Sequence, residues 1–364
     1  MQHVPSNINV NRCRQLIHRA IDTFELDLSG LVILTEAATG YYVLTPMIAA
    51  LAGAERICAV TRDSRYGSRQ VVRERTMALA DRWGLADRIE VIFSLEDERV
   101  GLADIVTNLG FVRPLDGPFL MRLKPTAVVP LMFETWEYRP EDLDLAQCRR
   151  LGIPVLGTNE HDPNLRIFTY VGHLVLKLLF ELDIEVYRSR VVVIGGGEFG
   201  GAVVNSLHAA GAEVCQVCTE EGELLQEQHR GNILGSCDAI VVVEHLSRQM
   251  IIGPKGQITA SELRSINPGV VLVHISGVVD RLAVEAAGIP IRPSQFAPAG
   301  HMAITTDHLG PRPLIDLHAA GLKVGELMAR ARLKGLACEE ARKEALKNSI
   351  CQDFNIRQRE QYGY

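Results

Sequence analysis

The chain has 364 residues, which is enough for two domains at roughly 100 to 200 residues per domain. Hydrophobic residues make up 47% and charged residues 23%, a composition that excludes extensive disorder. The formal net charge of -6 leaves no basic field for nucleic acid or an anionic membrane. We therefore expect a small-molecule substrate, with no nucleic-acid or membrane partner.

Residues 1–22 lack the uninterrupted apolar core of a signal peptide, and no stretch of about 18 apolar residues spans a bilayer. We therefore expect a cytoplasmic protein. The 8 cysteines are thinly spread, as reduced thiols are. Cys215 and Cys218 form a C-x-x-C pair within a predicted strand, where residues three apart point to opposite faces, so no metal site is expected there. The histidines form no H-x-x-x-H pair with a carboxylate either.

The first half of the chain alternates short apolar runs with helix-length segments. The runs predict strands within residues 31–38, 56–63, 88–94, 104–110, 126–134 and 153–159, and residues 43–54 and 68–84 predict helices between them. Such alternation indicates a parallel sheet that helices cover on both faces. Ligands of such sheets bind at the carboxyl ends of the strands.

A long amphipathic segment, residues 163–184, leads into a second alternating region. It predicts strands within residues 190–197, 212–219, 238–245, 270–277 and 289–295, followed by a helix over 311–335 and a charged helical tail. The predicted fold class is α/β, with two doubly wound parallel-sheet domains and a boundary near residue 160.

The second region opens with a glycine motif. Gly195, Gly197 and Gly200 fit G-x-G-x-x-G directly after a strand and at the start of a helix, which is the context that the motif requires. The first glycine permits a tight turn, the second a close approach to a pyrophosphate, and the third close packing of helix on strand. The helix N-terminus stabilises the phosphate charge. The motif predicts dinucleotide binding, and an empty nucleotide fold is the alternative.

The end of the next strand bears on the choice of dinucleotide. Cys218 stands where proteins that prefer NAD usually carry an acid for the ribose hydroxyls, and Thr219, Glu220 and Glu221 follow. No arginine that would bind a ribose phosphate occurs before Arg230. The sequence therefore favours NAD over NADP.

This layout resembles the D-2-hydroxyacid dehydrogenases, among them formate and glycerate dehydrogenases, and their relative S-adenosylhomocysteine hydrolase, over most of the chain. Residues 141–159 resemble the dehydrogenase stretch before the crossing helix, and residues 256–285 resemble the region with the pattern mkpgailvNtaRGg.vD. Residues 297–302, APAGHM, resemble the hydrolase's atGHps and stand where the dehydrogenases place a catalytic histidine.

The resemblance implies a flavodoxin-like substrate domain over 1–160, a Rossmann NAD domain over 161–310, and a returning helix and tail over 311–364 that pack on the first domain. It also implies a homodimer, formed through the helix of residues 163–184 that crosses between the two domains. The expected cofactor-binding residues, besides the three glycines, are Glu198, Phe199, Thr219, Glu220, His245 and Ser276.

Two departures from the family pattern bear on function. The dehydrogenases need an arginine after the strand that here reads His274 to Gly277, and that arginine is missing. The glutamate that would orient the catalytic histidine is also missing, since residues 292–296 offer only Arg292 and Gln295. The hydrolase pattern retains Asp162 and Asn164 but has no lysine.

Hydride transfer to a carbonyl needs a proton donor, and a histidine supplies one near neutral pH. His301 is the candidate acid/base, because the resemblance places it facing the nicotinamide; a structural histidine that caps the next helix is the alternative. Asp307 is the candidate to orient it in place of the missing glutamate.

The predicted strand ends of the first domain supply candidates for the same cleft. Glu134 and His161 are candidate catalytic residues; the candidate substrate-binding residues are Thr35, Glu36, Tyr41, Arg62, Thr135, Trp136 and Asn159. Glu134 and Glu137, two acids after one strand, suit a cationic or hydroxyl-rich substrate better than a bare acid. Solvated loops or helix caps are the alternative for each group.

Three functions remain open from the sequence. The first is an NAD-dependent oxidoreductase of the D-2-hydroxyacid dehydrogenase type that acts on an atypical small polar substrate. The second is an enzyme like S-adenosylhomocysteine hydrolase, which would use tightly bound NAD transiently. The third is a non-catalytic nucleotide-binding protein.

Overall fold

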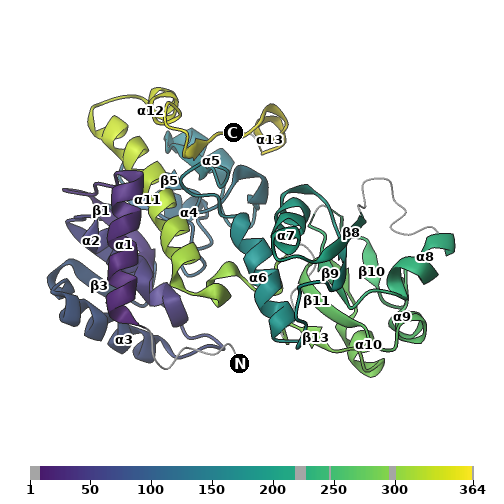
Figure 1. Ribbon diagram of the computed structural model, residues 1–364. Helices are drawn as coiled ribbons and strands as arrows, with labels where there is room; N and C mark the ends of the chain where they lie inside the picture. Colours follow the sequence, from purple (N-terminus) through teal and green to yellow (C-terminus); the bar gives the residue numbers. More distant parts are fainter. Residues whose placement is uncertain (1–8, 218–226, 246, 295–300, 363–364) are drawn as a thin grey trace. The chain divides into compact units, whose positions relative to one another are not determined.

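The computed structural model describes residues 9–217, 227–245, 247–294 and 301–362 (Figure 1). The chain divides into two compact units. The first unit comprises Met1–Arg166 with Pro311–Tyr364, and the second comprises Ile167–Gly310. Within the described ranges, no helix combines the length and the apolar character that crossing a membrane requires.

The first unit is built from strands and helices in alternation, with short 3-10 helices marked η. Its elements are α1 (Val10–Phe24), β1 (Val32–Glu36), η1 (Gly40–Leu44), α2 (Thr45–Leu51), β2 (Arg56–Val60), α3 (Arg69–Trp83), η2 (Ala86–Arg88), β3 (Ile89–Ile92), η3 (Glu98–Leu102), β4 (Ile105–Val106), α4 (Gly117–Leu120), β5 (Val129–Pro130), η4 (Thr135–Glu137), α5 (Leu145–Leu151), β6 (Val155–Thr158), α11 (Pro311–Leu333), α12 (Cys338–Ala345), β14 (Cys351–Gln352) and α13 (Ile356–Tyr362).

The sheet of the first unit runs in the order β3-β2-β1-β4 and continues through a parallel bridge between Ile105 and Val128 into β5-β6-β14. Only β14 is antiparallel to its neighbour. The chain reverses its direction of travel between β1 and β4, which is the topological switch point of a doubly wound sheet. Without the edge strand β3, this order is the flavodoxin-like one.

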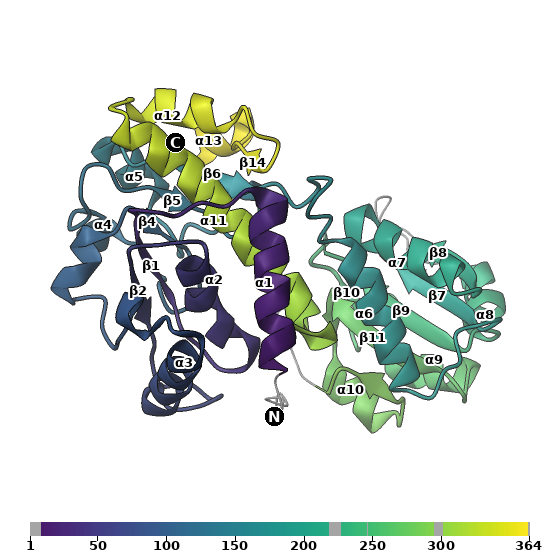
Figure 2. The same cartoon turned by 60° about the vertical axis from the view of Figure 1, so that its left-hand side comes forward.

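Helices α1 and α11 pack against each other within the first unit (Figure 2). The apolar residues of α1 that face the core recur at helical spacing, and Asn9 caps its N-terminus by accepting a hydrogen bond from the Arg12 amide. In α11, a Cβ atom at Gly321 would lie 2.6 Å from Met132 Sδ, and one at Gly325 would lie 2.7 Å from Ile105 Cγ2. These glycines therefore let α11 lie close to the sheet.

The second unit contains a separate sheet. Its elements are α6 (Thr169–Phe180), β7 (Arg190–Ile194), α7 (Gly197–Ala209), β8 (Glu213–Val217), α8 (Glu227–Leu234), β9 (Ala239–Val243), β10 (Met250–Ile252), α9 (Ala260–Ile266), β11 (Val271–Ser276), β12 (Val278–Val279), α10 (Arg281–Ala286), β13 (Ile291–Arg292) and η5 (Thr306–Leu309). The order β13-β11-β9-β7-β8 is parallel throughout, with the switch point between β7 and β9.

These sheets confirm the predicted fold class, and each apolar run of the sequence analysis contains a strand. The helix expected over 163–184 is shorter, because Arg166 and Asp183 adopt positive φ angles of 44° and 60° outside α6. Helix α1 and the short strands β10, β12 and β14 were not predicted. Every cysteine in the described part of the chain is a free thiol, as expected.

Candidate functional site

The predicted nucleotide turn joins β7 to α7 in the second unit. Gly195 has a φ of +131°, and a Cβ there would lie 2.7 Å from the backbone nitrogen of Glu244. A Cβ at Gly200 would lie 2.5 Å from the carbonyl oxygen of Gly195. Both positions therefore require glycine, the first for the turn beside β9 and the second for the approach of α7 to β7.

The N-terminus of α7 is suited to an anion. Its N-cap is Gly196, which has no side chain to satisfy the first backbone amides, and the helix continues for 13 residues. Gln216 of β8 donates to the Gly195 carbonyl at 3.0 Å, which fixes the turn from the other side. Glu198 lies in the first turn of the helix, where its carboxylate would compete with a phosphate for the same amides.

Two of the predicted cofactor residues pack together beside this turn. The rings of Phe199 and His245 stack with 4.6 Å between their centroids. The Phe168 ring is tilted relative to that of Phe199, with 5.8 Å between their centroids. Burial lowers the pKa of His245, so its imidazole is neutral at pH 7. The pair thus offers an apolar aromatic surface, not a cation, next to the helix N-terminus.

Ser276 ends β11 at the carboxyl edge of the same sheet. Its side-chain oxygen is buried and has no hydrogen-bond partner among the residues that the structure describes. Gly277 follows with a φ of +106°, and its carbonyl oxygen lies 2.9 Å from His274 Nε2. A buried hydroxyl without a partner is uncommon and suits a ligand or a water molecule. The turn, the helix N-terminus and Ser276 together fit a dinucleotide.

The remaining candidates of the second unit lie near its end. His301 is exposed, and Asp307 lies in η5, where its carboxylate accepts a hydrogen bond from the Thr305 hydroxyl. Burial raises the pKa of Asp307. His308 Nε2 lies 3.0 Å from Glu181 Oε1, which holds η5 on the end of α6. Thr219 and Glu220 lie outside the described residues.

The first unit places three glutamates together where β5 and β6 end. Glu134, 3% exposed, accepts hydrogen bonds from Trp136 Nε1 at 2.7 Å and from the Glu160 amide at 3.1 Å. His161 Nε2 lies 3.7 Å from Glu134 Oε1. Glu137 closes η4, three residues after Glu134. Since β5 and β6 are parallel neighbours, these side chains share the ligand-binding edge of the sheet.

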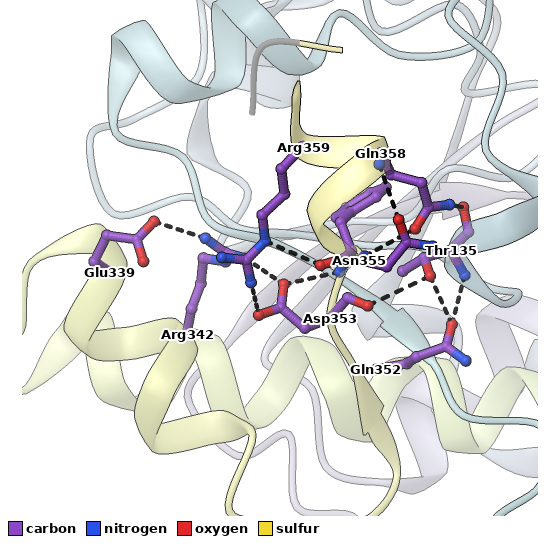
Figure 3. Close-up of polar contacts among 9 residues, drawn as sticks. Thr135, Glu339, Arg342, Gln352, Asp353, Asn355, Gln358 and Arg359 are labelled. Carbon is purple, nitrogen blue, oxygen red and sulfur yellow. Dashed lines mark hydrogen bonds and ion pairs between the residues drawn. The ribbon is translucent and has the colours of Figure 1, made fainter. Parts of the chain in front are cut away.

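The C-terminal tail holds the backbone between these acids (Figure 3). Gln352 Oε1 accepts hydrogen bonds from the Thr135 amide at 2.6 Å and from the Thr135 hydroxyl at 2.9 Å, and Gln358 Nε2 donates to the Thr135 carbonyl at 2.8 Å. Thr135 was predicted to bind substrate, but its polar atoms are engaged by the tail. Its contacts therefore fix the positions of Glu134 and Trp136.

An ion cluster anchors that tail in turn. Asp353 pairs with both Arg342 and Arg359, and Arg342 also donates to Glu339 at 2.6 Å (Figure 3). Arg342 is 3% exposed, whereas the side chains of Asp353 and Arg359 are 26% and 39% exposed, so one carboxylate bridges a buried and a partly exposed guanidinium group. This cluster holds α12, β14 and α13 as one folded segment.

The other substrate candidates of the first unit hold loops in place. Asn159 donates through Nδ2 to the Ser349 carbonyl at 2.8 Å, and Thr35 accepts from the Thr107 hydroxyl at 3.1 Å. Glu36 accepts from the Phe111 amide at 2.9 Å. Arg62 donates to the carbonyls of Phe111 and Arg113 at 2.6 Å each, and Tyr41 lies half-buried in η1.

Reasoning from the sequence placed Glu137 and Glu160 at these strand ends but did not select them as site residues, and it missed the tail residues that hold η4. The signal for Glu160 was its place directly after an apolar strand, beside His161. The contacts of the tail had no such signal, because β14 has only two residues and pairs with a strand far away in sequence.

Comparison with solved structures finds the same fold. The crystal structure of a dipicolinate synthase from Bacillus subtilis is 13% identical over 85% of this chain and 99% of that chain, with a TM-score of 0.52. A dipicolinate synthase from Bacillus halodurans is 12% identical over 80% of this chain and 96% of that chain, with a TM-score of 0.50. No protein-family model and no curated protein matched the chain.

Proposed function

We propose that this protein is an NAD-dependent oxidoreductase that acts on a small polar substrate. The observation that carries the proposal is the turn between β7 and α7, where Gly195 and Gly200 leave no room for a Cβ atom and the helix begins without a capping side chain. This is the arrangement that a pyrophosphate needs from a backbone. The fold shared with the two dipicolinate synthases is compatible with it.

The backbone of residues 195–200 would hold the diphosphate, and Phe199, His245 and Ser276 would line the rest of the site. Thr219 and Glu220 would meet the ribose, which favours NAD over NADP. When bound, NAD supplies a hydride acceptor or donor. The protein's own task is then to place the substrate and to move a proton.

His301 is the proposed acid/base. It would give a proton to the alkoxide oxygen when a carbonyl is reduced, or accept one from the hydroxyl in the opposite direction. The exposed imidazole of His301 can exchange protons with solvent. Asp307 is the proposed partner that orients the ring, and Glu134 and His161 are proposed to contact the substrate from the first unit.

Native mass spectrometry of freshly purified protein tests the cofactor, because it reports the identity and occupancy of a bound dinucleotide together with subunit number. NAD in the spectrum, or NAD binding by calorimetry, supports the proposal. Turnover that releases NADH supports a dehydrogenase, whereas retained NAD without net NADH supports transient use of the cofactor. If the protein binds neither NAD nor NADH, the proposal is overturned.

We further propose that the protein is a homodimer, and only the resemblance of its sequence to the D-2-hydroxyacid dehydrogenases supports this proposal. The apolar residues of α6 do not argue for it directly, because Val175, Leu178 and Leu179 are already buried within the second unit. Phe180, which ends α6, and Tyr187, which follows it, are 57% and 70% exposed and could take part in such a contact. A monomer by light scattering would contradict this proposal.

A further inference from the structure

At the carboxyl ends of β2 and β3, a buried hydroxyl group has no hydrogen-bond partner among the residues that the structure describes. It belongs to Thr61, which directly follows β2 and is completely buried, and the atom without a partner is its Oγ1. Buried hydroxyl groups in proteins normally have a partner. Thr61 therefore provides a buried hydrogen-bond donor that lacks an acceptor.

An aromatic ring lies beside this hydroxyl. Thr61 continues the parallel ladder of β2 and β3, because its amide donates to the Ile92 carbonyl at 3.0 Å. Thr61 and Phe93 are therefore the next neighbours in register, about 5 Å apart, with side chains on the same face of the sheet. Ala59, two residues before Thr61 and on that face, packs in one cluster with Val72 of α3. The hydroxyl and the ring thus lie on the face that the first turn of α3 covers.

Two arginines of α3 lie over that ring. The guanidinium carbon of Arg69 lies 5.1 Å from the centroid of the Phe93 ring, and that of Arg73 lies 5.7 Å from the same centroid. The two residues are four positions apart on one helix, and like charges at this spacing repel each other. The ring attracts each cation but neutralises neither. The helix therefore brings two positive charges together beside Thr61.

The acids of this helix start leave most of that charge uncompensated. Asp63 lies 3.7 Å from Arg69, with the two side chains 65% and 51% exposed, so this ion pair is weak. The Asp63 carboxylate also accepts a hydrogen bond from the Arg69 amide at 2.8 Å, which ties it to the backbone at the start of α3. Glu74 accepts from Gln70 at 3.0 Å. Within the described ranges, Arg73 forms no ion pair.

We propose that Arg69, Arg73 and the Thr61 hydroxyl bind the doubly charged phosphate group of a phosphate monoester. A guanidinium group donates in a fork that fits phosphate oxygens, and the hydroxyl supplies a further donor beside the ring. The anion would relieve the repulsion between the arginines and give Thr61 its acceptor. Exposed side chains change rotamer within nanoseconds, so the two arginines can separate to admit the anion to the buried hydroxyl. The site does not depend on NAD binding, because the nucleotide turn belongs to the second unit.

Methyl phosphate is the probe, at about pH 8, where it carries two charges, and dimethyl phosphate is the singly charged comparison. Calorimetric titration into the full chain at constant ionic strength should show saturable binding of methyl phosphate. Dimethyl phosphate should bind at least about tenfold more weakly.

Arg69→Gln and Arg73→Gln should each weaken the binding of methyl phosphate about tenfold, because each removes a charge-assisted contact. Arg75→Gln is the matched control. It removes the same charge from an exposed side chain of the same helix, and residues two apart on a helix do not share a face. The control should bind methyl phosphate as the parent does.

Thr61→Val keeps the shape of the side chain and removes its hydroxyl. Without phosphate, this variant should have a thermal midpoint at least as high as that of the parent, because the lost hydroxyl had no partner. Methyl phosphate should raise the midpoint less in Thr61→Val than in the parent, and Thr61→Ser should restore the full rise. A lower midpoint in Thr61→Val with an undiminished rise would assign the hydroxyl a structural role and overturn its part in the site.

The inference is overturned if the parent shows no saturable binding of methyl phosphate, or if both phosphates bind equally well. It also fails if binding persists undiminished in Arg69→Gln and Arg73→Gln, or if Arg75→Gln weakens it to the same extent. NAD is titrated into the same variants, and its affinity should be unchanged in Arg73→Gln. A parallel loss of NAD affinity would show that the two ligands share one site, which contradicts a separate phosphate site in the first unit.

Discussion

The adjacent glycines 200 and 201 offer a matched test of the nucleotide turn. A Cβ at Gly200 would lie 2.5 Å from the Gly195 carbonyl oxygen, whereas a Cβ at Gly201 meets nothing within 4 Å. Both residues lie in α7, so an alanine at either gains the same helix propensity, about 1 kcal/mol. The two substitutions differ only in the contact with the turn.

Gly200→Ala must move the start of α7 away from Gly195 by about 1 Å, because the Cβ would lie 2.5 Å from the carbonyl oxygen and ordinary contacts begin at 3.4 Å. Overpacking of this kind costs about 1–3 kcal/mol, which cancels or exceeds the gain in propensity. Gly201→Ala should therefore raise the thermal midpoint of unfolding, and Gly200→Ala should leave it unchanged or lower it. The displaced amides should weaken NAD binding about tenfold or more in Gly200→Ala alone.

Calorimetric titration of NAD into the parent and both variants measures this difference, with circular dichroism to establish that each variant is folded. If the two alanine variants bind NAD with the same affinity as the parent, the diphosphate does not lie against this turn and the reasoning fails. Equal weakening in both would show that the effect comes from the helix as a whole, which also contradicts it.

His301→Ala should abolish turnover, measured by stopped-flow, but leave the dissociation constant of NAD, measured by calorimetry, unchanged. Weakened NAD binding would assign His301 to the cofactor instead. Gln352→Leu leaves the buried Thr135 amide without an acceptor and should lower the free energy of unfolding by about 1–3 kcal/mol, measured by denaturant titration. Gln361→Leu is the control variant. Equal losses of unfolding free energy in the two variants would argue against the tail contact. The raised pKa of Glu137 means that its contribution to stability is complete below its usual value of 4.5 and is lost as pH rises through about 7. Glu137→Gln should therefore flatten the fall in unfolding free energy over that range, and an unchanged slope would contradict the shift.

The strands were predictable because burial on both faces demands nearly continuous apolar runs, as in Val191, Val192 and Val193 of β7. The glycine turn was predictable because only glycine fits beside β9 at Gly195. The substrate contacts were not predictable from the sequence, because a long side chain can contact any of several partners that lie far away in sequence. Arg62 was a candidate substrate-binding residue, yet it donates to two carbonyls of the loop after β4.

The missing arginine after β11 has a backbone explanation that bears on the substrate. Gly277 has a φ of +106°, and a Cβ there would lie 3.1 Å from the Glu244 carbonyl oxygen and from Ile251 Cδ1. Any longer side chain at this position is strained, so the turn is built to carry none.

An enzyme without that guanidinium cannot bind a substrate carboxylate in the way the resemblance implies. Restoring an arginine at 277 should therefore destabilise the fold without conferring activity on simple hydroxyacids, and activity on such acids in the Gly277→Arg variant would refute this explanation.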